Sequence, residues 1–158
     1  MNVIRLPGVA VEVNGAGVLI RGPSGSGKSY AALGLLDRGH RLISDDVVEI
    51  VRQEDGALYA RPVEGHVRIE IRGLGVFRVD SLFPGGTAKS ARLELVVELG
   101  AYNGERDSGR IKPKVESASI LGREVRQVFL ALPHGVDPAL IIELLAKRVG
   151  RLGTVWEE

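Results

Sequence analysis

The residue types and spacing of one short segment point to phosphate chemistry. Residues 22–29 match the pattern G-x-x-x-x-G-K-S, in which the backbone N–H groups of a glycine-rich loop surround phosphates. In such a loop the lysine, here Lys28, reaches the β and γ phosphates, and the hydroxyl of Ser29 ligates Mg²⁺. The predicted nucleotide-binding residues are Gly22, Pro23, Ser24, Gly25, Ser26, Gly27, Lys28 and Ser29.

The flanking residues supply the strand and the helix that such a loop requires. The apolar run Val18–Ile20 precedes the loop, and an apolar segment over residues 31–36 follows it. Gly39 fits the position after a helix C-terminus, where a positive φ is favoured. A helix that starts at the loop directs its free N–H groups and its positive dipole end at the phosphates. We therefore predict a strand, a phosphate loop and a helix in succession.

Two adjacent aspartates, Asp45 and Asp46, are the second candidate for chemistry. They directly follow a short strand predicted over residues 41–44. Because successive strand residues point to opposite sides, one carboxylate could face Mg²⁺ and the other an acceptor hydroxyl. Repulsion between two close carboxylates also raises the pKa of one of them toward the range of a proton acceptor. The pair could thus divide metal binding and proton transfer, and a simple acidic turn is the alternative.

The rest of the chain is predicted to be rich in strands. Alternating valines over residues 9–13, followed by Asn14-Gly15, predict a β-hairpin whose second strand leads into the phosphate loop. Further strands are expected over residues 41–44, 47–52, 57–60, 67–71, 76–79, 92–99, 115–121 and 125–132. Over residues 93–99, Glu94, Val96 and Glu98 alternate with four apolar residues, and this period of two predicts a sheet with one apolar face.

Two segments near the C-terminus have different patterns. Residues 100–114 are polar and contain several glycines, which predicts a long loop that acts as a lid. Asp137-Pro138 predicts the start of a helix, with Asp137 as its N-cap. The apolar stripe of this helix is predicted to consist of Leu140, Ile141, Leu144, Leu145 and Val149, with Glu143, Lys147 and Arg148 largely opposite.

Length, composition and charge limit the class of protein. The 158 residues, of which 44% are hydrophobic and 26% charged, predict one globular domain over residues 1–158. A formal net charge of +1 without a basic run argues against nucleic acid as the main partner. The absence of cysteine excludes disulfides and thiolate metal sites. We expect a soluble cytoplasmic protein with no membrane partner, because the sequence has neither a signal peptide nor a long apolar run.

Three blocks of sequence carry a resemblance to a known family. They cover residues 17–29 with the phosphate loop, residues 36–46 with the acidic pair, and residues 70–76, which read Glu-Ile-Arg-Gly-Leu-Gly-Val. In order and spacing these blocks resemble the catalytic domain of the HPr kinase/phosphorylase family, without its separate N-terminal domain. The resemblance implies an α/β fold with a P-loop nucleotide-binding core of the phosphoenolpyruvate carboxykinase-like type, built from mixed and antiparallel sheets with few helices.

The resemblance also implies an activity and the residues that perform it. The expected reaction is transfer of phosphate from ATP, with Mg²⁺, to a serine of a phosphocarrier protein such as HPr. The reverse phosphorylase reaction uses inorganic phosphate and releases pyrophosphate. Ser29, Asp45 and Glu70 would hold Mg²⁺, and Asp46 would be the base. The implied catalytic residues are Asp46, Asp45, Lys28 and Arg106, the last being the loop arginine that meets the transferring phosphate. A homo-oligomer, a ring of six, is the implied assembly.

Departures from the family pattern leave two other functions open. Pro7 stands where the family has a histidine, Val47 where it often has an arginine, and Glu124 where it has an asparagine. One alternative is a regulatory nucleotide-binding module that has lost catalysis. The other is a kinase that acts on a small molecule.

Overall fold

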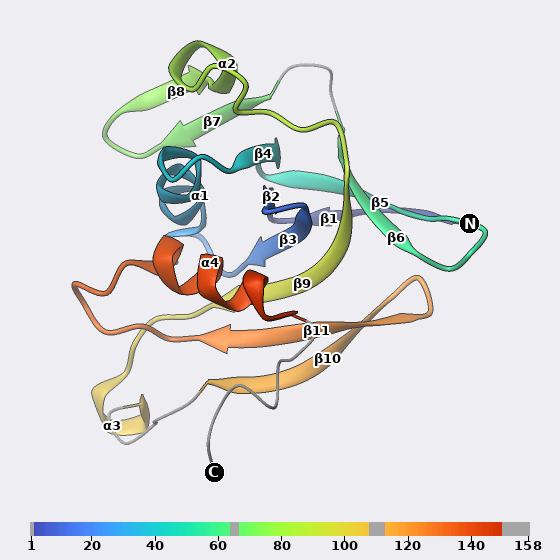
Figure 1. Cartoon of the computed structure of the whole chain (residues 1–158). Helices are drawn as coiled ribbons and strands as arrows, with labels where there is room; N and C mark the ends of the chain where they lie inside the picture. Colours follow the sequence, from blue (N-terminus) through green and yellow to red (C-terminus); the bar gives the residue numbers. More distant parts are fainter. Residues whose placement is uncertain (1, 64–66, 108–112, 150–158) are drawn as a thin grey trace.

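The computed structural model describes residues 2–63, 67–107 and 113–149. Helices are few among these residues, as predicted, and only α1 and α4 are longer than about one turn (Figure 1). The helices are α1 (Lys28–Asp37), α2 (Val79–Leu82), α3 (Gly104–Asp107) and α4 (Pro138–Lys147).

Strands form most of the regular secondary structure and pair in two sheets. The nine-stranded sheet runs in the order β1-β5-β6-β9-β3-β2-β4, and the β10–β11 hairpin joins it through β11, which also pairs with β9. Its strands are β1 (Val3–Pro7), β2 (Val9–Val13), β3 (Ala16–Arg21), β4 (Arg41–Ser44), β5 (Val47–Arg52), β6 (Leu58–Pro62), β9 (Ala91–Leu99), β10 (Lys114–Ile120) and β11 (Arg123–Leu130). The second sheet is the hairpin of β7 (Arg68–Ile71) and β8 (Gly75–Arg78).

The pairing confirms a mixed sheet. Strands β3 and β11 both run parallel to β9, whereas the other strand pairs are antiparallel. The predicted hairpin of β2 and β3 is present, and β3 leads directly into the phosphate loop. The carboxyl ends of β3, β9 and β11 lie at one edge of the sheet, which is where ligands bind in sheets with parallel strands.

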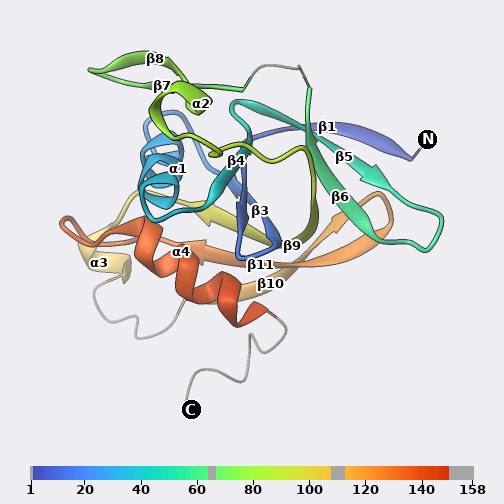
Figure 2. The same cartoon turned by 45° about the horizontal axis from the view of Figure 1, so that its top comes forward.

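Strand β9 shows that the prediction of a sheet with one apolar face was wrong. Leu95 and Val97 are buried in a cluster with α1 and α4, but Val96 between them is equally buried in a second cluster. That second cluster includes Val48 and Ile50 of β5, because the sheet curls and the β5–β6 hairpin covers its other face (Figure 2). The run Leu95-Val96-Val97 is a local sign of burial on both faces, but which strands cover the second face depends on the curl of the whole sheet.

Helix α4 begins as predicted but buries a partly different side. Asp137 caps it by accepting a hydrogen bond from the Ala139 N–H (2.9 Å). The predicted apolar stripe is correct only in part: Leu145 is buried and Ile141 and Val149 pack against the core, but Leu140 and Leu144 are 40% and 49% exposed. The buried side chains are Ala139, Ile142, Glu143, Leu145 and Ala146.

Small residues explain how closely α4 approaches α1. A Cβ atom added at Gly34 of α1 would lie 2.7 Å from the Cβ of Ala139. The two helices can touch at this point only because Gly34 has no side chain. The contact fixes the orientation of α4 and brings Glu143 toward the C-terminal end of α1, where it meets Arg38.

The predicted lid is structured in part. Helix α3 lies within it, and residues 108–112 of the lid are outside the described residues.

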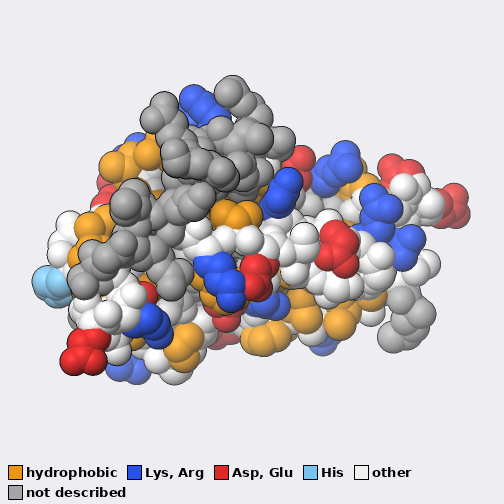
Figure 3. Space-filling view, turned by 90° about the horizontal axis from the view of Figure 1, so that it is seen from below, with side chains coloured by type: hydrophobic (Ala, Val, Ile, Leu, Met, Phe, Trp, Pro, Cys, Tyr) orange, Lys and Arg blue, Asp and Glu red, His pale blue; other side chains and the backbone are white. Residues whose placement is uncertain are grey.

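On the described part of the face in Figure 3, basic and acidic side chains are interspersed rather than separated into regions of one sign. Among the described helices, none combines the length and the apolar character needed to cross a membrane.

Candidate active site

The phosphate loop connects β3 to α1 in a conformation that requires glycine. Gly22 has a φ of +149°, and a Cβ there would lie 2.4 Å from the Leu99 carbonyl oxygen. Gly25 and Gly27 also have positive φ values, +83° and +96°. The predicted succession of strand, loop and helix is thus present, with the backbone wound tightly enough for its N–H groups to converge on a ligand.

The N-terminus of α1 is suited to an anion. Gly27 occupies the N-cap and makes no side-chain cap, and the first turn contains no acidic residue. The Lys28 ammonium donates to the Gly22 and Pro23 carbonyl oxygens (2.6 and 3.2 Å), so its charge sits on the loop. The Ser26 hydroxyl is buried without a hydrogen-bond partner among the described residues. These features fit phosphate groups, which would accept hydrogen bonds from the free donors.

Asp45 is held beside the loop by two donors. The Ser29 hydroxyl donates to one of its carboxylate oxygens (3.1 Å), and the Glu70 N–H donates to the other (3.1 Å). Burial raises the pKa of Asp45, the nearby Asp46 charge raises it further, and the two donated bonds oppose the shift. The prediction that one carboxyl of the pair has a raised pKa is confirmed, although burial rather than the neighbouring charge is the main cause. In the described chain no basic side chain pairs with Asp45.

Asp46 points elsewhere because the backbone turns sharply at this residue. Its φ is +67°, and the Val47 N–H donates to the Asp45 carbonyl (2.8 Å), which makes Asp46 the centre of a three-residue turn. A non-glycine residue with positive φ persists only where its surroundings hold it. Here the Gly8 N–H donates to the Asp46 carbonyl (2.8 Å) and provides such a restraint.

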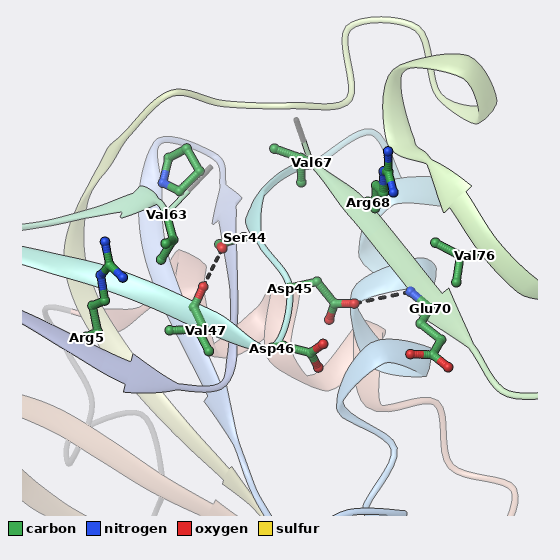
Figure 4. Close-up of a pocket in the computed structure, with 11 residues that line it drawn as sticks. Arg5, Ser44, Asp45, Asp46, Val47, Val63, Val67, Arg68, Glu70 and Val76 are labelled. Atoms are coloured by element: carbon green, nitrogen blue, oxygen red, sulfur yellow. Dashed lines mark hydrogen bonds between the residues drawn. The ribbon is translucent and has the colours of Figure 1, made fainter. Parts of the chain in front are cut away.

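Two cavities meet at the acidic residues. The phosphate cavity, about 420 Å³, is lined by the loop, by the start of α1 and by Asp46, Glu70 and Arg72. The acceptor cavity, about 400 Å³, lies on the other side (Figure 4) and is lined by Asp46, Glu70, Asp45, Arg5 and Val76 among others. Asp46 and Glu70 line both cavities, so their exposed carboxylates lie between them.

The structure brings together most of the predicted site residues. Lys28, Ser29, Gly25 and Gly27 share one cavity with Asp46 and Glu70, and Asp45 contacts Ser29. Within the described residues, no three His, Cys, Asp or Glu side chains are grouped so as to hold a metal by themselves. Mg²⁺ commonly takes only one or two carboxylates and completes its shell with phosphate oxygens and water, so Ser29, Asp45 and Glu70 fit it as partial ligands.

Arg106 is not placed with the others. Its guanidinium donates to Asp107 (2.9 and 2.8 Å) and to the Ala101 carbonyl (2.9 Å), and it lines a separate cavity with Glu98 and Lys114. Arg72 of the third block lines the phosphate cavity instead, and its place just before Gly73 and Gly75 in the sequence already favoured a functional role. No sequence pattern around Arg5 or Arg68 indicated that they line the acceptor cavity, because they lie on strands distant from the phosphate loop in sequence.

Comparison with known proteins agrees with this geometry. The chain is 40% identical to an HPr kinase/phosphorylase of Geobacillus kaustophilus over 92% of its length and 48% of the relative's. It is 37% identical to an HPr kinase/phosphorylase of Treponema pallidum, over 95% of this chain and 49% of that one. The chain therefore spans about half the length of these curated relatives.

A solved structure extends the agreement to the fold. The Hpr(Ser) kinase/phosphatase of Coxiella burnetii superposes with a TM-score of 0.81 at 29% identity, covering 96% of this chain and 93% of that one. The family model for the HPr serine kinase C-terminal domain matches residues 2–153. On sequence and on fold, the chain belongs to the HPr serine kinase C-terminal domain family.

Proposed function

We propose that this chain transfers the γ-phosphoryl group of ATP, with Mg²⁺, to a serine hydroxyl of a phosphocarrier protein of the HPr type. The observation that carries the proposal is that Asp46 and Glu70 line both the phosphate cavity and the acceptor cavity. A phosphoryl group that passes between two substrates in line needs one substrate on each side of such a boundary.

On the donor side, the residues of the loop would bind and orient the triphosphate. Lys28 would exchange its bonds to the Gly22 and Pro23 carbonyls for bonds to β and γ phosphate oxygens. Ser29, Asp45 and Glu70 would hold Mg²⁺, with Asp45 already aligned by its contact with Ser29. The ion, when bound, supplies charge neutralisation at the β and γ phosphate oxygens.

On the acceptor side, Asp46 would take the proton of the attacking hydroxyl. Its carboxylate is exposed to the acceptor cavity, and its backbone is fixed by the bond from the Gly8 N–H. That restraint comes from the main chain, so it does not depend on the side chain at position 7, where this chain has proline. We therefore expect the kinase direction to survive the replacement of the family's histidine by Pro7.

Two arginines are proposed to meet the charge of the transferring group. Arg72 already lines the phosphate cavity. Arg106 would first have to exchange its bonds to Asp107 for bonds to the phosphate. A planar guanidinium can bind two phosphate oxygens at once, which suits both residues to the role.

The partners follow from the proposed reaction. The relatives named HPr kinase/phosphorylase favour an HPr-like protein as the acceptor, and an ATP-dependent reaction of this kind is expected in the cytoplasm. The ring of six remains a prediction, which sedimentation velocity of the purified protein would test.

The test is transfer from radiolabelled ATP with Mg²⁺ to purified HPr and to the same HPr with its acceptor serine replaced by alanine. We expect label on the first protein and none on the second. Binding of ATP without label on HPr or on any metabolite would favour the regulatory module. Label on a metabolite in place of HPr would favour the small-molecule kinase.

A further inference from the structure

A third cavity lies at the opposite end of the phosphate loop from the acceptor cavity. Its volume is about 630 Å³, and the connection between β11 and α4 forms one of its walls. We propose that this cavity, called here the nucleoside cavity, binds the base and ribose of the nucleotide. The inference deepens the proposed function, on which it rests, by assigning the part of the structure that holds the non-reacting end of the donor.

The position of the cavity follows the direction that a bound triphosphate must take. Gly27 and Tyr30 line both the nucleoside cavity and the phosphate cavity, so the two spaces are adjacent. Asp46 and Glu70 then join the phosphate cavity to the acceptor cavity. The three cavities therefore form a series, and a nucleotide whose γ phosphate faces Asp46 has its nucleoside in the space on the far side of the loop.

The topology of the sheet supports the same assignment. Leu99 at the end of β9 and Leu130 at the end of β11 line the nucleoside cavity, next to the loop that follows β3. These three strands are the parallel ones of the sheet. In sheets of this kind the ligand binds beyond the carboxyl ends of the parallel strands.

The chemistry of the lining suits a base more than another anion. Leu99, Leu130, Leu132 and Val136 provide apolar surface. The Asp137 carboxylate is occupied by the N-cap bond from Ala139. Known ligand pockets have volumes of about 300–1,000 Å³ and mostly apolar linings, and this cavity falls within that range.

Tyr30 supplies an aromatic surface at the junction with the phosphate cavity. It is the second residue after Lys28 on α1, and it is 65% exposed. An exposed tyrosine beside an anion site has little reason to be there for packing, whereas stacking of a base on an aromatic ring is favourable.

The test compares Mg-ATP with Mg-tripolyphosphate, which has the phosphates but no nucleoside. Their dissociation constants are measured by titration calorimetry for the full chain and for Val136→Trp, Tyr30→Ala and Tyr30→Phe. Val136→Trp places an indole in the cavity at a residue that is 39% exposed. Leu82→Trp, at an exposed site on α2 (47% exposed), is the matched control for the added indole.

We expect Val136→Trp and Tyr30→Ala to weaken Mg-ATP binding at least about ten-fold and to change Mg-tripolyphosphate binding less than about two-fold. Tyr30→Phe, which keeps the ring, should bind Mg-ATP more tightly than Tyr30→Ala does, and Leu82→Trp should leave both constants unchanged. Mg-ATP binding that is unaffected in Val136→Trp and Tyr30→Ala, or equal weakening of both ligands, overturns the nucleoside assignment. Failure of the unaltered protein to bind either ligand would instead contradict the proposed function.

Discussion

Asp45 and Glu143 are both carboxylates that the fold removes from water, but their surroundings differ. Glu143 of α4 accepts two bonds from Arg38 (3.0 and 2.7 Å) and lies 2.5 Å from a ring nitrogen of His40. Arg38 and His40 together lower the pKa of Glu143 to about 2. Among the described residues, the partners of Asp45 are a hydroxyl and backbone amides, and burial raises its pKa.

The difference teaches how to distinguish a structural carboxylate from a functional one. Glu143 has a cationic partner, Arg38, built into the chain, so its charge is compensated when the protein folds. Asp45 is partly buried, no cation pairs with it within the described part of the chain, and it lies beside a hydroxyl and a phosphate loop. A carboxylate in that position is suited to a cation that arrives with the substrate. Asp46 differs from Glu143 even more, because its carboxylate is exposed at the junction of two cavities.

The largest expected effect is on Asp46. Asp46→Asn should lower the rate of phosphoryl transfer by about 10²–10⁴, because a positioned base contributes this much to a proton transfer. Asparagine tolerates positive φ as aspartate does, so the turn at this residue should be kept. Single-turnover transfer measures the loss, and titration calorimetry should show unchanged Mg-ATP affinity. A variant that still transfers at the original rate would remove Asp46 from the role of base.

Glu143→Gln should be the most destabilising of these substitutions. It leaves the Arg38 guanidinium and His40 without their carboxylate. Hydrogen bonds to charged groups contribute about 1.5–3 kcal/mol, and because the Arg38 side chain is 37% exposed we expect a loss near the lower end of that range. The free energy of unfolding in urea measures the change. As control, Glu116→Gln removes an exposed carboxylate from its pair with Lys114 and should change that free energy little. Equal losses of unfolding free energy in both variants would show that the bonds of Glu143 to Arg38 and His40 do not stabilise the fold.

Asp45→Asn should have the opposite effect to Glu143→Gln: the stability of the fold is kept, and the affinity for Mg-ATP falls. We expect the free energy of unfolding to change by less than about 1 kcal/mol, because a lost hydrogen bond is offset by removal of a poorly compensated charge. Affinity for ATP in the presence of Mg²⁺ should fall at least about ten-fold, the loss seen even for groups that only position a metal ligand. Calorimetric titrations with and without Mg²⁺ separate the two effects. A variant whose Mg²⁺ dependence is unchanged would contradict the assignment of Asp45.

The two carboxylates also differ in how far the sequence could predict them. Asp45 and the phosphate loop belong to local patterns, so their roles could be inferred without the fold. Glu143 was expected on the polar side of its helix, because its partner His40 is 103 positions away in sequence. The same limit applies to β9, where burial of Val96 depends on the curl of the sheet. The nucleoside cavity likewise combines Tyr30 with the end of β11, a contact between segments that no local pattern connects.

The smallest expected effect is a difference in acid response. The pKa of Glu143 is lowered on folding, so its contribution to stability is present above its unfolded pKa and is lost as the pH falls from about 4.5 toward 2. The pKa of Asp45 is raised on folding, so ionisation of this carboxyl opposes folding at neutral pH, and that opposition disappears in acid.

Urea unfolding of the original chain, Glu143→Gln and Asp45→Asn at a series of pH values from 7 to 3 tests this opposition directly. Relative to the original chain, the deficit of Glu143→Gln should shrink as the pH falls, because the original chain loses the same contribution. The free energy of unfolding of the Asp45→Asn variant should instead fall relative to that of the original chain as the pH falls. Acid neutralises the unfavourable Asp45 charge of the original chain, whereas the variant has no charge at this position. Parallel curves for the two variants would show that both carboxylates have the same function in the fold, and the distinction between a structural and a metal-binding carboxylate would no longer hold.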